Sequence, residues 1–191
     1  MGNRDALVEG AKTCLLEKGY SRTTARDIAT AAGVSLAAIG YHFGSKDTLL
    51  NEALRALLID EWATQVEPVR AADAHEQFVG TWRQIAESLR EPRMRALWAA
   101  QFEVLSLGGS MPELIADLVK MQGEAREGLA AMFGGVEAGA APEQVKAIGA
   151  FLQALLLGVV AQSMLDPASA PTGEQLAQSL RQLAERISPS A

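Results

Sequence analysis

Start and stop signals for helices divide this chain into short segments, and each segment has helical periodicity. Gly19, Gly33 and Gly44 end the first three segments, while Pro92 and Pro142 stand where two later ones begin. Between these breaks, apolar residues recur every three or four positions. Aromatic residues make up only 5% of the chain, so strand-forming side chains are sparse. The pattern therefore predicts an all-α fold.

We expect about nine helices. Their approximate ranges are 4–18, 25–33, 36–43, 46–65, 73–89, 93–107, 112–133, 142–166 and 172–187. Thr24 followed by Asp27 predicts a capped N-terminus for the second helix, and Ser35 is expected to cap the third. We place a domain boundary after residue 46, which separates an N-terminal domain (1–46) from a larger helical domain (47–191).

The charge distribution limits where an anionic partner can bind. The net charge is −6, but residues 1–47 carry six basic groups against five acidic ones. A contact with nucleic acid is therefore expected only in the N-terminal part, and the charge permits it without establishing it.

Cysteine and histidine usage argues against a metal centre or a disulfide. Cys14 is the single cysteine, and the two histidines lie far apart. We expect Cys14 to be a small buried hydrophobic residue. No segment reaches the roughly 20 uninterrupted apolar residues of a membrane span, and no apolar signal core is visible. We expect a cytoplasmic protein without cofactor, metal or membrane contact.

Residues 24–43 have the layout of a helix-turn-helix, in which two short helices cross steeply. Ala29 is small where the helices approach, and Gly33 suits a left-handed turn. Ile28, Val34 and Ile39 are apolar where the pair must seal against the first helix. The second short helix then presents small residues, as a helix that enters a major groove does. A helical hairpin of ordinary core packing would show the same spacing, so spacing alone leaves both interpretations open.

A family resemblance favours the DNA-binding interpretation. The residues in question read Thr23-Thr24-x-x-Asp27-Ile28-Ala29-x-x-Ala32-Gly33-Val34-Ser35, then Tyr41-His42-Phe43-x-Ser45-Lys46-x-x-Leu49-Leu50. This pattern resembles the signature of TetR-family transcriptional regulators over about residues 5–55. The chain departs from many members at Gly40, where they have an aromatic residue, so a contact made there is missing.

The resemblance implies roles for the matching residues. The hydroxyl of Tyr41 suits a phosphate, His42 suits a phosphate or a base edge, and Lys46 would hold a phosphate at the start of the fourth helix. Phe43 is expected in the core instead. The complete set of expected DNA-binding residues is Arg22, Thr23, Thr24, Ser35, Leu36, Ala37, Ala38, Tyr41, His42 and Lys46.

Large apolar residues in the middle of the chain are the candidates for a ligand site. Ordinary core packing explains each of them, but the resemblance implies a cavity for a small, largely apolar effector. The expected lining residues are Trp62, Phe78, Trp82, Trp98, Phe102 and Met121. Polar partners for such a ligand are available at Gln101, Glu103, Gln122 and Glu124, which a solvated helix face would equally explain.

The helix at 142–165 is apolar nearly all round, so it needs cover on both sides. Pairing with a second subunit into a four-helix bundle would provide that cover, and Gly149 and Gly158 would permit close approach of helices. The expected dimer contacts are Phe151, Leu155, Gly158, Val159, Leu176, Leu180 and Leu183. A monomer with a well-covered core is the alternative.

These expectations combine into a ligand-responsive repressor that binds a palindromic operator as a homodimer, with no enzymatic activity. The alternatives are a regulator of this type controlled by a protein partner, an activator, or a helical carrier or enzyme. No catalytic set of Ser, His and Asp and no phosphate-binding glycine loop supports an enzyme. The sequence leaves open the effector, the operator and the regulated genes.

Overall fold

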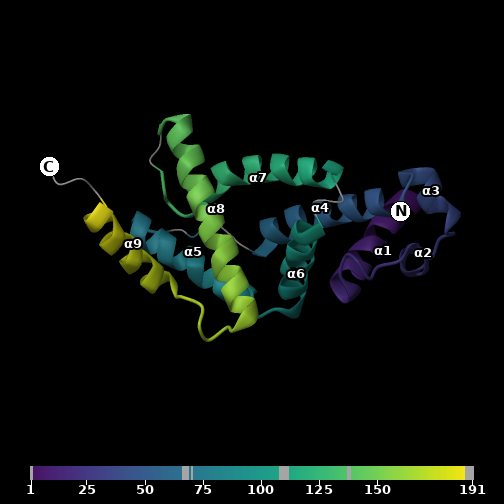
Figure 1. Ribbon diagram of the computed structural model, residues 1–191, viewed down its shortest axis with the longest axis horizontal. Coiled ribbons are helices and arrows are strands. Elements are labelled where there is room, and N and C mark those ends of the chain that lie inside the picture. Colours follow the sequence, from purple (N-terminus) through teal and green to yellow (C-terminus); the bar gives the residue numbers. More distant parts are fainter. Residues whose placement is uncertain (1, 66–68, 70, 108–111, 137–138, 188–191) are drawn as a thin grey trace. The chain divides into compact units, whose positions relative to one another are not determined.

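A computed structural model describes residues 2–65, 69, 71–107, 112–136 and 139–187 of the chain (Figure 1). Those residues form nine α-helices and no strand. The helices are α1 (Asn3–Lys18), α2 (Ala25–Ala32), α3 (Ala37–Phe43), α4 (Lys46–Gln65), α5 (Ala74–Ser88), α6 (Pro92–Leu107), α7 (Pro112–Met132), α8 (Pro142–Leu165) and α9 (Gly173–Ile187). The predicted all-α fold is confirmed.

Local signals set the helix ends, and most of them act as predicted. Thr24 and Asp27 form a reciprocal capping box at the start of α2, and Gly33 ends that helix in the left-handed conformation, with φ of 66°. The hydroxyl of Ser45 accepts a hydrogen bond from the amide of Thr48 in the first turn of α4. The prediction for Ser35 is wrong, because α3 begins at Ala37 without a side-chain cap.

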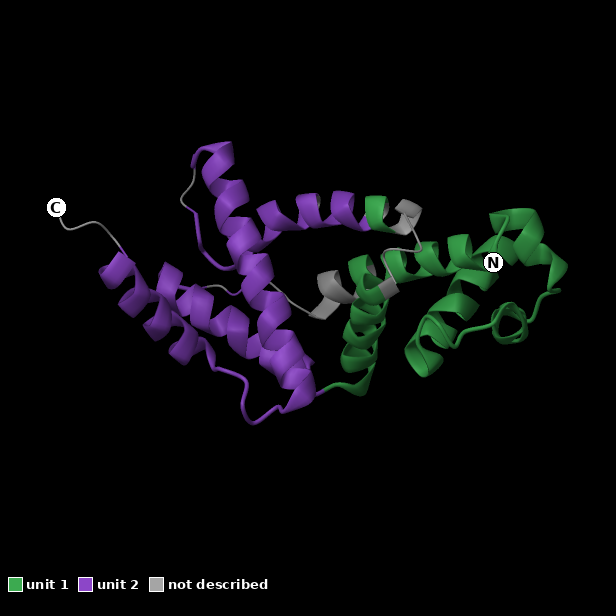
Figure 2. Ribbon diagram, in the orientation of Figure 1, with its two compact units in different colours: residues 1–64, 91–117 green, residues 65–90, 118–191 purple. Residues whose placement is uncertain are grey.

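The helices form two compact units (Figure 2). Unit 1 contains residues 1–64 and 91–117, and unit 2 contains residues 65–90 and 118–191. This division does not follow the predicted boundary after residue 46, because α4 and α6 cluster with the first three helices. The units are therefore not continuous along the chain. Helix α6 belongs to unit 1 although it follows α5, which belongs to unit 2.

Unit 1 is built on a close approach of α1 and α2. Gly10 lies at the contact, where a Cβ atom would come within 2.8 Å of the backbone nitrogen of Ala32. Leu7 and Ile28 are completely buried beside it. Cys14 is buried as predicted, and its burial raises the pKa of the thiol. A protonated, enclosed thiol is a packing group with little reactivity.

Unit 2 has two close helix contacts of the same kind. A Cβ atom on Gly173 of α9 would lie 2.9 Å from Trp82 Cβ on α5. A Cβ atom on Gly149 of α8 would lie 2.1 Å from the carbonyl oxygen of Arg126 on α7. Gly149 therefore serves contact within its own subunit, whereas Gly158 is exposed, and a Cβ atom added there would meet no atom within 4 Å.

The expected dimer residues separate into buried and exposed groups. Val159 and Leu176 are only 7% and 8% exposed, so two of the predicted interface residues already belong to the core of unit 2. Their place at a dimer interface stays a prediction, because periodicity locates an apolar face without showing which neighbour covers it. Phe151 and Leu183 stay about half exposed, Gly158 is exposed, and Leu155 and Leu180 are half-buried.

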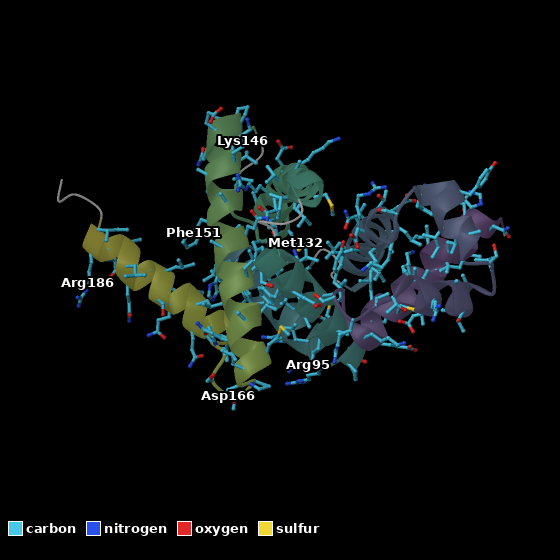
Figure 3. The ribbon with its side chains drawn as sticks, turned by 45° about the vertical axis from the view of Figure 1, so that its right-hand side comes forward. Arg95, Met132, Lys146, Phe151, Asp166 and Arg186 are labelled. Carbon is cyan, nitrogen blue, oxygen red and sulfur yellow. The ribbon has the colours of Figure 1, made fainter. Side chains whose placement is uncertain are left out.

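Helix α8 carries the most apolar stretch of the chain. Figure 3 shows Lys146 near one end, Asp166 just beyond the other and Phe151 between them. By length and composition α8 could cross a membrane, and 33% of its most apolar stretch is buried within its own chain. The apolar residues of α8 are nevertheless interrupted, as expected, by Lys146 and Gln153. A helix in the core of a dimer has the same length and composition.

Candidate nucleic-acid interface

The turn between α1 and α2 fixes the base of the helix-turn-helix. The hydroxyl of Thr23 donates toward the carbonyl oxygens of Gly19 at 2.7 Å and Cys14 at 3.2 Å. Thr23 is 1% exposed, so its side chain is not available to a DNA phosphate. The predicted contact is corrected: Thr23 ties α1 to the start of α2, and its hydroxyl is satisfied inside the protein.

Thr24, Asp27 and Lys18 form an exposed polar cluster at the start of α2. Asp27 accepts hydrogen bonds from the amide and the hydroxyl of Thr24, at 2.9 and 2.7 Å, and pairs with Lys18 Nζ at 2.6 Å. The bond from Lys18 and those from Thr24 hold the pKa of Asp27 well below its usual range. Asp27 therefore stays charged at neutral pH and neutralises one of the few cations near the predicted interface.

The outer face of α3 is exposed and uncharged. Tyr41 is 85% exposed and Leu36 is 48% exposed, and both Ser35 and Ala37 are also exposed. Ala38 is only 9% exposed, which corrects its predicted place on the face that reads DNA. Ala38 and Ile39 are both buried, so they lie on the side of α3 that packs within unit 1.

Ring contacts organise the end of α3. The rings of Tyr41 and His42 meet edge to face, with centroids 4.9 Å apart. Phe43 is buried as predicted, and the guanidinium of Arg4 lies 5.1 Å from its ring centroid. His42 is half-buried next to these rings, so only Tyr41 projects fully from the helix end.

Lys46 and Arg22 lie at the surface but have partners within unit 1. Lys46 Nζ is 3.1 Å from a carboxylate oxygen of Asp47 and donates a long 3.4 Å hydrogen bond to the carbonyl of Thr23. Arg22 is exposed, and its Nε donates to the carbonyl of Lys18 at 2.7 Å. A phosphate at Lys46 would therefore compete with Asp47.

Two residues outside the predicted set belong to this region. Arg26 is exposed in the first turn of α2, and the local excess of basic residues was the available signal for it. Glu103 on α6 accepts hydrogen bonds from the backbone amides of Tyr20 and Ser21, at 2.8 and 2.9 Å. No local signal identifies Glu103, because 82 residues separate it from Ser21.

The hydrogen bonds around Glu103 determine its charge state. Burial by itself would raise the pKa of Glu103, but the bonds from Ser21 and Tyr20 and the nearby charge of Arg22 outweigh it and lower the pKa. Gly19 completes this turn with φ of 80°, and a Cβ atom there would lie 2.9 Å from Glu103 Oε2. Glu103 is thus a structural anchor of the α1–α2 turn, although the sequence suggested it as a ligand partner.

The expected effector residues fall into two aromatic groups, one in each unit. In unit 1, the Trp98 and Phe102 rings have centroids 6.2 Å apart. In unit 2, Trp82 packs against Phe78 at 6.2 Å and against Phe133 at 5.0 Å. Trp82 is 3% exposed and its indole N–H has no hydrogen-bond partner.

The other expected effector residues are less informative. Met121 is half-buried on α7, and the side chains of Trp62 and Glu124 lie outside the described residues. Gln101 Oε1 is buried without a hydrogen-bond partner, whereas Gln122 is half-buried. The ligand cavity therefore stays a prediction. Within the described residues, no group of three or more His, Cys, Asp or Glu side chains is placed to hold a metal ion.

Comparison with known proteins connects this geometry to a family. Residues 7–53 match the family described as bacterial regulatory proteins, tetR family. The chain is 31% identical over 121 residues to the HTH-type transcriptional repressor KstR2 of Rhodococcus jostii, a match that covers 62% of this chain and 51% of that protein. It is also 31% identical over 118 residues to the repressor AcnR of Corynebacterium efficiens, covering 55% of this chain and 61% of AcnR.

A solved structure extends the likeness to the whole fold. The transcriptional regulator from Rhodococcus sp. Rha1 superimposes with a TM-score of 0.68 at 24% identity, over 97% of this chain and 96% of that one. At this identity the likeness concerns the fold alone. Among the curated relatives, the matched region spans only about half the length of KstR2.

Proposed function

We propose that this chain is a transcriptional repressor of the TetR family, which its matching N-terminal residues support, and that it binds a palindromic operator as a homodimer. A small, largely apolar effector would release it from DNA. The observation that carries the proposal is the exposed outer face of α3, held on a helix-turn-helix whose other faces are packed. In a helical hairpin that serves only core packing, large side chains such as Tyr41 and Leu36 would be expected to pack inward, but they are 85% and 48% exposed.

Phosphate contacts would come from the ends of the two short helices. Arg22 and Arg26 are exposed at the start of α2, and Tyr41 projects from the end of α3. Lys46 is the first residue of α4, and a helix N-terminus favours an anion such as a phosphate. These groups position the protein on the duplex and do not by themselves read its sequence.

The homodimer is supported by apolar residues that unit 2 leaves uncovered. Phe151 and Leu165 on α8 are 50% and 88% exposed, and Leu183 and Ile187 on α9 are 56% and 78% exposed. Two copies of α8 and α9 would cover them in a four-helix bundle. Two α3 helices would then address half-sites about 34–36 Å apart, or a multiple of that spacing.

An effector site is supported by buried polar atoms without partners. In unit 2, the indole N–H of Trp82 and the side-chain oxygen of Gln84 are enclosed and unbonded. A buried polar group without a partner costs about 1–3 kcal/mol, so a ligand that satisfied one of them would gain affinity. Trp82 packs against the rings of Phe78 and Phe133, which favours an apolar ligand with few polar atoms.

Selection from random duplexes tests the DNA-binding proposal directly. The purified protein is expected to enrich inverted repeats at modest salt, and the selected DNA should shift as a complex with two protein copies. Recovery of no duplex above background would overturn the proposal. Thermal-shift screening of the same preparation tests the effector: a small molecule that raises the melting temperature should weaken the selected complex. A regulator controlled by a protein partner would bind DNA and respond to no small molecule.

Replacing Tyr41 by phenylalanine should weaken operator binding by about a hundredfold, because one hydroxyl bond to a charged phosphate is lost in each of the two half-sites. The free energy of unfolding should not change, since Tyr41 is 85% exposed. Fluorescence anisotropy of labelled operator and urea unfolding measure the two quantities.

Tyr20→Phe is the matched control, because the Tyr20 hydroxyl bonds to Asn51 inside unit 1 and Tyr20 is 2% exposed. That variant should lose stability instead. Unchanged operator affinity in Tyr41→Phe would remove Tyr41 from the interface.

A further inference from the structure

The outer face of α3 lacks the side chains that read guanine or adenine by paired hydrogen bonds. Between residues 28 and 43 the sequence contains no Arg, Lys, Asn, Gln, Asp or Glu. Guanine is read mainly by Arg or Lys and adenine by Asn or Gln. The polar side chains available on this segment are hydroxyls and one imidazole, from Thr30, Ser35, Tyr41 and His42.

Apolar groups occupy the part of the face that remains. Leu36 is 48% exposed at the start of α3, and Ala37 is exposed directly after it. Gly40 lies one turn further along, also exposed, and a Cβ atom there would meet no atom within 4 Å. The face therefore combines a projecting isobutyl group with a shallow surface where a base edge can approach the backbone.

Thymine is the base whose major-groove edge matches this surface. Its 5-methyl group is apolar, and contact with apolar side chains is how proteins recognise it. A cytosine amino group or a guanine oxygen placed against Leu36 would lose a water partner and gain none. Such desolvation penalises the other bases at the same positions.

We propose that Leu36 and Ala37 select operator half-sites by contact with thymine 5-methyl groups. This inference rests on the proposed DNA-binding function and specifies the base that is recognised, thymine, and the group that is contacted, its 5-methyl. Ser35 can supplement the contact, because it is exposed directly before Leu36.

Replacement of thymine by deoxyuridine in the selected operator tests the proposal, because it removes only the methyl group and keeps every hydrogen-bonding group of the base pair. Burial of one methyl corresponds to about fourfold in affinity, so one symmetric pair of substitutions should weaken binding about sixteenfold. Substitutions at thymines outside the α3 footprint are the internal control and should change the affinity less than about twofold.

The variant Leu36→Ala identifies the protein group that senses the methyl. Leu36 is exposed, so the variant should fold normally, and its affinity ratio between thymine and uracil operators should fall toward one. The inference is overturned if uracil operators bind as tightly as thymine operators, or if Leu36→Ala keeps the full ratio. Failure to select any duplex would instead overturn the proposed function, so the two failures are distinguishable.

Discussion

Replacing Gly149 by alanine is expected to lower the free energy of unfolding by about 3 kcal/mol or more, the upper end of the range for overpacked cores. The added methyl would lie 2.1 Å from the carbonyl oxygen of Arg126 and 2.6 Å from its carbonyl carbon. These are backbone atoms of α7, so no side-chain rotation relieves the clash and the two helices must separate. Urea unfolding followed by tryptophan fluorescence, at one fixed protein concentration, measures the loss.

Gly123→Ala is the matched control. Gly123 is exposed within α7, and a methyl group added there would meet no atom within 4 Å. Alanine has the higher helix propensity, so this variant should gain up to about 1 kcal/mol. Equal stability of Gly149→Ala and the wild type would show that α7 and α8 do not approach at these residues.

Replacing Glu103 by alanine should loosen the turn between α1 and α2 and weaken operator binding by about tenfold. Its carboxylate holds the amides of Tyr20 and Ser21, and its removal leaves two donors without protein partners. Amide hydrogen exchange is the decisive measurement, because protection at Tyr20 and Ser21 should fall selectively. Glu127→Gln on α7 makes a similar change of charge at an exposed position and should leave that protection unchanged.

The same contact predicts a pH dependence. The pKa of Glu103 is lowered in the folded state, so its contribution to stability is complete above the pKa of the unfolded chain and is lost as the pH falls through the folded pKa. In Glu103→Gln the free energy of unfolding should fall less as the pH is lowered, because the glutamine amide does not titrate in this range. Wild-type protection at Tyr20 and Ser21 in Glu103→Ala would contradict the anchoring role.

Local chemistry explains why so much of the helical architecture could be predicted. The box formed by Thr24 and Asp27, the left-handed Gly33 and the proline at the start of α8 each act within about four residues. Their signals are therefore complete in the sequence. The helix-turn-helix was predictable for the same reason, because its residue types repeat at fixed short offsets.

Ser35, Thr23 and Ala38 show where that reasoning ends. Ser35 looks like a cap, but α3 starts one residue later than the cap would require. Thr23 and Ala38 lie in the motif yet are buried: the Thr23 hydroxyl bonds to α1, and Ala38 is on the packed side of α3. Which side of a short helix faces solvent depends on its neighbours, and periodicity over seven residues does not resolve it.

The helices, most of their caps and the uncharged character of α3 follow from the amino-acid sequence, because each depends on residues adjacent along the chain. Tertiary packing was needed to establish that Glu103 reaches the α1–α2 turn, that Gly149 meets Arg126, and that Val159 and Leu176 are already buried. Some of these contacts join residues that are tens of positions apart. Others depend on which of several neighbouring helices covers one apolar face. Their outcome depends on the packing of whole helices, which no local pattern encodes.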